Sequence, residues 1–207
     1  MVKFLKLAIA LSAVVAMTFV FAGCGTSDEA TPDEAAVQSA EEVTEEVAGS
    51  APEKTAGGVG IDVGQTPPGF ALVDLDGNEV SLSDFEGDVV ILDMWATWCP
   101  PCRKEIPFLV SLYEEYKDQG LAVVGVALDQ GGASVVAPYV EANGVTYTIL
   151  LGNQEVSRDY RVSGIPMTLI IDRAGSVAYK EVGFAPEMEP RMRAKVEQLL
   201  ATAAPQA

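Results

Sequence analysis

The sequence predicts an α/β protein with a central mixed sheet flanked by helices, and three observations predict it. From about residue 65 onward, short runs rich in Val, Ile and Leu alternate with segments whose apolar residues recur at helical spacing. Residues 88–96 are almost entirely apolar, which is typical of a strand buried on both faces. The last two predicted strands, 167–172 and 176–182, are separated by a three-residue turn, so they are expected to pair as an antiparallel hairpin.

The elements follow one another in a regular alternation. Two short strands flank the turn at Asp76-Gly77-Asn78, ahead of the buried strand 88–96. A long helix is predicted next, because its apolar residues recur at helical spacing until Gly120 ends it. This long helix spans residues 100–119. The remaining elements are strand 121–128, helix 132–142, strand 146–151, helix 154–160, strands 167–172 and 176–182, and helix 186–201.

Residues 1–23 have the features of a signal peptide. Lys3 and Lys6 precede an apolar run over residues 7–22, and the run ends in Phe21-Ala22-Gly23-Cys24. This end resembles a bacterial lipoprotein signal, which implies cleavage before Cys24 and attachment of lipid to Cys24. An uncleaved transmembrane helix is the alternative, since the run is only slightly shorter than the roughly 20 residues that span a bilayer. Both interpretations place the rest of the chain outside the cytoplasm, anchored to the cell membrane.

A polar segment, residues 24–62, separates this signal from the domain. It contains no aromatic residue, and its ten acidic residues face a single cation, Lys54. Such a composition cannot bury enough apolar surface to offset the entropy of ordering, so a disordered, lipidated tether is expected. Residues 63–207 are then expected to form one folded domain.

The overall composition excludes several classes of function. The chain has 207 residues, 13 Lys and Arg against 30 Asp and Glu, and a net charge of −17. A nucleic-acid partner is not expected, because binding needs a basic face to replace counterions. The chain contains no histidine, which excludes Ser-His-Asp hydrolysis and most catalytic zinc sites. We expect a monomer with neither a metal nor a cofactor.

The chemistry is expected at Cys99-Pro100-Pro101-Cys102, between the buried strand and the long helix. Prolines are tolerated in a first helical turn because its N–H groups have no intrahelical partner. The remaining free N–H groups and the helix dipole favour an anion, so the pKa of Cys99 is expected below the free value of about 8.5. Cys102 lies one turn later and can attack a mixed disulfide formed at Cys99. The order therefore predicts Cys99 as the nucleophile and Cys102 as the resolving thiol.

Two other interpretations of the cysteine pair are less favoured. A zinc site needs four N or S ligands, and the chain has no histidine and no second pair of cysteines. A purely structural disulfide across two residues closes so short a loop that it adds little stability. A redox-active pair is therefore predicted.

Two acids and one proline are candidates for supporting roles. Asp93 lies inside the buried strand, where desolvation should raise its pKa, and it could accept the Cys102 proton. Glu105 lies one helical turn after Cys102 and could do the same, or it could be an ordinary solvated acid on the helix surface. Pro166, in Gly164-Ile165-Pro166, enters a predicted strand, which suggests a turn or a cis bond.

Residues 91–107, with Gly164-Ile165-Pro166 and residues 169–172, resemble the TlpA/ResA group of membrane-tethered, thioredoxin-like thiol–disulfide oxidoreductases. The resemblance covers roughly residues 65–202. It implies a thioredoxin-like fold with an extra helix–strand insertion between the active cysteines and Pro166. It also implies a cis bond at Pro166 and a Cys99–Cys102 pair that cycles between dithiol and disulfide.

The resemblance further implies roles for neighbouring residues. Trp98 is expected to pack over the site and Trp95 to lie in the core. Asp93 occupies the place of the buried Asp of thioredoxin, and Glu105 matches the acid that the TlpA/ResA group often uses. Since the chain carries both acids, the main proton acceptor is left open. The substrate-binding residues implied are Trp98, Pro100, Pro101, Ile165 and Pro166.

The leading functional hypothesis is reduction of extracytoplasmic protein disulfides, such as those of apocytochrome c or a partner protein. The family implies a membrane thiol-electron carrier as the reductant.

Oxidation of secreted protein thiols is an alternative. Another is a thiol peroxidase, because residues 65–107 also resemble the alkyl hydroperoxide reductase/thiol-specific antioxidant superfamily. That superfamily places a Thr three residues before its Cys, whereas Thr97 is two before Cys99 and Cys102 would intercept the chemistry. A non-catalytic binding lipoprotein is disfavoured by the intact Cys99, Cys102 and Pro166.

Overall fold

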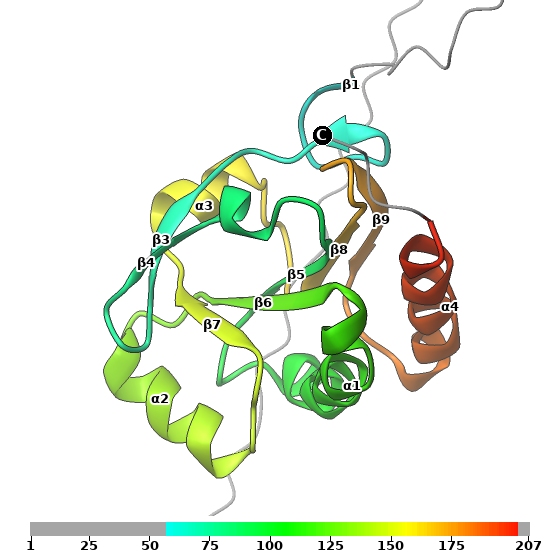
Figure 1. The fold of residues 1–207 in the computed structure, drawn as a ribbon. Helices are drawn as coiled ribbons and strands as arrows, with labels where there is room; N and C mark the ends of the chain where they lie inside the picture. Colours follow the sequence, from blue (N-terminus) through cyan, green and yellow to red (C-terminus); the bar gives the residue numbers. More distant parts are fainter. Residues whose placement is uncertain (1–56, 203–207) are drawn as a thin grey trace, which may run out of the picture. The chain divides into compact units, whose positions relative to one another are not determined.

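The computed structural model describes residues 57–202 (Figure 1). The signal peptide 1–23, Cys24 and most of the expected tether lie outside the described residues. The strands are β1 (Gly57–Val59), β2 (Gln65–Thr66), β3 (Ala71–Asp74), β4 (Glu79–Ser81), β5 (Val89–Trp95), β6 (Leu121–Ala127), β7 (Thr148–Leu151), β8 (Met167–Ile171) and β9 (Val177–Val182). The helices are α1 (Pro100–Tyr116), α2 (Ala133–Ala142), α3 (Gln154–Asp159) and α4 (Glu189–Leu200), with short 3₁₀ segments η1 (Leu82–Phe85), η2 (Lys117–Gln119) and η3 (Pro186–Met188). No helix within residues 57–202 is both long enough and apolar enough to cross a bilayer.

Seven strands form one mixed sheet in the order β4-β3-β7-β6-β5-β8-β9. β5 pairs in parallel with β6, and β6 pairs in parallel with β7, because helical crossovers connect them. β8 is antiparallel to β5, and β9 forms the predicted hairpin with β8. The mixed α/β sheet expected from the sequence is therefore confirmed. α2 and β7 form the helix–strand unit between α1 and α3 that was expected as an insertion.

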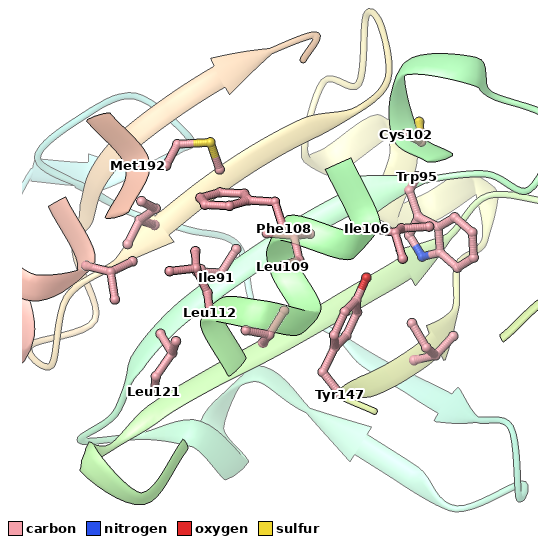
Figure 2. Close-up of a cluster of buried hydrophobic side chains, with 14 of the residues drawn as sticks. Ile91, Trp95, Cys102, Ile106, Phe108, Leu109, Leu112, Leu121, Tyr147 and Met192 are labelled. Atoms are coloured by element: carbon pink, nitrogen blue, oxygen red, sulfur yellow. The ribbon is translucent and has the colours of Figure 1, made fainter. Parts of the chain in front are cut away.

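The sheet has an apolar core on each face. On one face, β5 and β6 pack against α1, α2 and α4, and Figure 2 shows Trp95 beside Ile106 and Ile91 near Leu109 of α1. On the other face, α3 and the partly buried side chains of η1 cover the strands. Trp95 has no exposed surface, as expected for a core residue. All seven residues of β5 are buried, which explains why its sequence shows no alternation of apolar and polar residues.

The folded domain begins earlier than the sequence indicates. The boundary was expected at residue 63, but β1 (Gly57–Val59) pairs in parallel with β2. Ile61 is only 4% exposed and packs in the core that α3 covers, and Asp62 forms an ion pair with Lys180. Composition missed this segment because one buried isoleucine anchors it, while its neighbours are glycine and polar residues.

The direction of β5 positions the reactive segment. The strand ends at Trp95 and α1 begins at Pro100, so residues 96–99 turn at the carboxyl end of a fully buried strand. Next to β5, Gly125 of β6 leaves room for core side chains. A Cβ added there would lie 2.8 Å from Ile149 Cδ1, 2.9 Å from Trp95 Nε1 and 3.2 Å from Tyr147 Cε2. Only glycine allows these three side chains to meet above β6.

Gly125→Ala is therefore expected to destabilise the oxidised protein by about 1–3 kcal/mol, because the added methyl group overpacks the core. Urea unfolding followed by circular dichroism measures the change. Gly69→Ala is the matched control, since Gly69 is exposed and an added Cβ there would have no atom within 4 Å. The control is expected to change stability by less than about 0.5 kcal/mol. Equal effects of the two substitutions would contradict the packing argument.

Candidate active site

Cys99 and Cys102 are joined by a disulfide with an S–S distance of 2.11 Å and a Cα–Cα distance of 5.3 Å. Cys99 is the N-cap of α1, and Pro100 and Pro101 occupy the first turn. The backbone N–H of Cys102 donates to Cys99 Sγ over 3.3 Å. A helix N-terminus with a donated N–H stabilises a thiolate at this sulfur once the disulfide is reduced. Cys99 keeps 2% of its surface exposed and Cys102 none, so Cys99 is the more accessible of the two sulfurs.

The loop before β8 lies against this disulfide. The Ile165–Pro166 peptide bond is cis, as the family resemblance implied. The carbonyl oxygen of Ile165 is 3.6 Å from Cys99 Sγ, although the two residues are far apart in sequence. Pro166 is buried and Ile165 is half-buried, so the backbone of Ile165 is the part of this loop that borders the reactive sulfur.

Both candidate acids are buried on the α1 face of the sheet. Asp93 and Glu105 are each 1% exposed, so the interpretation of Glu105 as a solvated surface acid is wrong. Thr168 of β8 pairs directly with Asp93 of β5, and its hydroxyl donates to Glu105 Oε1 over 2.8 Å. Because side chains opposite each other on paired strands share a face, Thr168 brings the two acids into one site.

Burial changes the acidity of both groups. Desolvation raises the pKa of Asp93 well above its ordinary value, and the nearby Glu105 charge raises it further. Desolvation raises the pKa of Glu105 to about 7, while the hydrogen bond from Thr168 opposes that rise. Among residues 57–202, no group donates a hydrogen bond to either Asp93 carboxyl oxygen. Both acids therefore keep their protons to a higher pH than solvated carboxyl groups do.

Sequence reasoning missed the residue that holds the turn before Cys99. Asp129 accepts hydrogen bonds from the Thr97 backbone N–H (3.0 Å) and from the Thr97 hydroxyl (2.6 Å). Asp129 lies just after β6, and Thr97 lies just after the parallel neighbour β5. The shared carboxyl edge of two adjacent parallel strands is the signal that could have paired them.

A cavity of about 500 Å³ opens beside this turn. Trp98 borders it and is 66% exposed. The residues that line the cavity are Thr97, Trp98, Leu128, Asp129, Gln130, Gly131 and Val135. No three His, Cys, Asp or Glu side chains in the described part of the chain are grouped to hold a metal ion.

A mixed sheet, a disulfide at the N-terminus of α1 and a cis-proline against it define a thiol–disulfide oxidoreductase of the thioredoxin type. The model of the AhpC/TSA family matches residues 63–180, and the chain belongs to this family.

The chain is also similar to named thiol–disulfide oxidoreductases. The chain is 40% identical over 126 residues to the thiol-disulfide oxidoreductase ResA of Geobacillus kaustophilus, covering 60% of this chain and 70% of that protein. It is 39% identical over 127 residues to the thioredoxin-like protein YneN of Bacillus subtilis, covering 60% and 74%. A crystal structure from Chlorobium tepidum, proposed to be the thiol:disulfide interchange protein DsbE, aligns with TM-score 0.65 and 34% identity over 68% of this chain and 99% of that one. The protein is a thiol–disulfide oxidoreductase of the ResA/DsbE type.

The raised pKa of Glu105 makes stability depend on pH. The folded protein holds the Glu105 proton more tightly than the unfolded chain does. The contribution of this proton to the free energy of unfolding is therefore fully present below pH 4.5 and is lost as pH rises to about 7. The loss should be on the order of 3 kcal/mol. Glu105→Gln should reduce this slope, because glutamine does not ionise and still accepts the Thr168 hydrogen bond, and Asp93 should account for the slope that remains.

Urea unfolding of the oxidised protein at several pH values between 4.5 and 7.5 measures the slope. Glu155→Gln, an exposed position on α3, is the control and should keep the wild-type slope. A Glu105→Gln protein with the wild-type slope would show that Glu105 does not titrate in this window.

Proposed function

We propose that the protein is a lipid-anchored, extracytoplasmic oxidoreductase that reduces disulfides of other proteins, with apocytochrome c as one candidate substrate. The observation that carries the proposal is the Cys99–Cys102 disulfide at the start of α1, with two buried acids behind it. Residues 1–23 would be the signal peptide, Cys24 the lipidated residue, and the acidic segment up to about residue 56 the tether. A membrane thiol-electron carrier would restore the dithiol after each cycle.

In the first step, the Cys99 thiolate attacks one sulfur of the substrate disulfide. The Cys99–substrate S–S bond forms, the substrate S–S bond breaks, and the second substrate sulfur leaves as a thiolate that takes a proton from solvent. The N–H of Cys102 and the dipole of α1 favour the attacking thiolate.

In the second step, the Cys102 thiol loses its proton and attacks Cys99 Sγ. The Cys99–Cys102 bond forms, and the first substrate sulfur leaves with the electron pair, so one disulfide is exchanged for two thiols. Glu105 is the better proton acceptor, because it lies one turn after Cys102 and its anion accepts the Thr168 hydrogen bond. A pKa of about 7 leaves part of Glu105 ionised at neutral pH, which suits a general base. Asp93, without such a donor, would hold its proton.

The substrate would lie across the edge where Cys99, Trp98 and the Ile165 loop meet. The exposed face of Trp98 and the adjacent cavity offer an apolar contact next to the reactive sulfur. The Ile165 carbonyl would accept a backbone N–H from the substrate chain, and Pro100, Pro101 and Pro166 would shape the rest of the surface.

Membership of the AhpC/TSA family keeps a thiol peroxidase as the second candidate. The Thr97 hydroxyl already donates to Asp129, which supports a structural role for Thr97 rather than a role beside a peroxide at Cys99. Cys102, bonded to Cys99, would capture any oxidised Cys99. These contacts favour disulfide exchange.

The residue before the cis-proline, Ile165, resembles that of reducing thioredoxins and supports the reducing direction.

Cys102→Ser is expected to trap substrates, because the second step loses its nucleophile while the first step remains. The variant, purified from the native cell envelope without reductant, should carry proteins that reductant releases and that mass spectrometry identifies. Cys99→Ser is the matched control and should trap none. An empty Cys102→Ser protein, combined with peroxide turnover by the wild type, would favour the peroxidase.

Mass spectrometry of the membrane-extracted protein tests the anchor. The expected mature chain begins at Cys24 and carries lipid, and Cys24→Ser should remove the lipid mass, whereas Cys99→Ser should retain it. A chain that still begins at Met1 would contradict cleavage and support the transmembrane anchor.

A further inference from the structure

A third proton-bearing group lies beside the two acids and has no part in the steps above. Tyr147, just before β7, is 5% exposed, and among residues 57–202 no partner hydrogen-bonds its hydroxyl. Figure 2 shows the Tyr147 ring with its hydroxyl end toward Ile106 and Trp95. A buried phenol without a partner is unfavourable, and phenylalanine would fill the same space without that penalty. The hydroxyl therefore calls for an explanation.

The strand pairing of β5 places Tyr147 on the side of Asp93 that is opposite Thr168. On the β8 side, Asp93 pairs with Thr168, whose hydroxyl donates a hydrogen bond to Glu105. On the β6 side, Asp93 pairs with Gly125. The space above Gly125 is occupied by the edge of Tyr147, whose Cε2 lies 3.2 Å from the position of a Cβ. The two in-register neighbours of Asp93 thus connect it to Glu105 and to Tyr147.

Unpaired polar atoms gather at this point. Both carboxyl oxygens of Asp93, Oε2 of Glu105, the Tyr147 hydroxyl and Nε1 of Trp95 are buried and lack hydrogen-bond partners among the described residues. Ionised carboxyl oxygens only accept, the indole N–H of Trp95 only donates, and the phenol of Tyr147 can do both. The other titratable groups that face Tyr147 are Tyr113 of α1, edge-on at 6.4 Å between ring centroids, and Tyr139 of α2. Neither is a carboxylate, so the Asp93–Glu105 pair is the acceptor that this donor matches.

We propose that Tyr147 is a positioning residue whose hydroxyl donates a hydrogen bond to the Asp93–Glu105 pair when the pair is ionised, and so sets the pH at which Cys102 can be deprotonated. The proposal rests on the proposed role of that pair as proton acceptor. Desolvation and the two nearby carboxyls raise the pKa of Tyr147 well above its ordinary value, so the phenol keeps its proton and remains a donor throughout the working pH range. Tyr147 itself neither touches the substrate nor gives up a proton.

Single-turnover reaction with DTNB, an aromatic disulfide whose released thiolate is coloured, separates the two steps. The reduced protein releases one thiolate when Cys99 attacks and a second when Cys102 resolves the mixed disulfide. In Tyr147→Phe the carboxylate loses its donor, so the pH midpoint of the second release should rise by about one unit. That release should then be about ten-fold slower at pH 6 and unchanged at high pH. The first release should keep its wild-type pH profile.

The matched control is Tyr160→Phe, which removes a buried hydroxyl from the other face of the sheet, where it donates to the Pro68 carbonyl. This control should keep the wild-type pH profile. A Tyr147→Phe profile equal to that of the wild type, or slowed equally at every pH, would overturn the inference. If Glu105→Gln and Asp93→Asn change the second release but Tyr147→Phe does not, the inference fails while the proposed function stands. If none of the three variants changes it, the proposed proton acceptor fails as well.

Discussion

β5 lies between β6 and β8, and the register of these pairings places Asp93 opposite Thr168 on one side and Gly125 on the other. This register brings a carboxyl from β5 and a carboxyl from α1 into one dry site, because the Thr168 hydroxyl reaches Glu105. It also leaves space above Gly125 for Trp95 and Tyr147. A slip of one residue would turn Asp93 to the opposite face and separate these groups.

The same strand directs the chemistry at its end. β5 leads into α1 through a turn that Asp129 holds by two hydrogen bonds to Thr97. The turn places Cys99 where the backbone N–H of Cys102 reaches its sulfur, while the loop that ends in Pro166 brings the Ile165 carbonyl against the same sulfur. The helix N-terminus thus favours an anion at Cys99, while Asp93 and Glu105 are buried on the α1 face of the sheet. The separation suits a reaction in which one sulfur attacks as a thiolate and the other must first lose a proton.

The buried acids weaken the fold at the pH where they ionise. Desolvation raises the pKa values of Asp93 and Glu105, so the folded state is most stable when both are protonated and becomes less stable as pH rises. Replacing either acid by a neutral residue of the same shape removes this penalty. Two such groups in an apolar core lower stability above the pH at which they ionise, and this cost is consistent with the proposed role of one of them as a proton acceptor.

Local patterns in the sequence were sufficient for most of the architecture. The apolar run of β5, the helical spacing of α1 and the Cys99-Pro100-Pro101-Cys102 order each depend on residues that are neighbours along the chain, so they could be recognised without the fold. Contacts between residues that are distant in sequence could not be recognised in this way. The burial of Glu105, the bond from Asp129 to Thr97, the exposure of Trp98 and the attachment of residues 57–62 by Ile61 all depend on strand register and on which helix covers which face. Only the tertiary structure decides these, because the same acid at the same helical position is solvated or buried according to the strand beneath it.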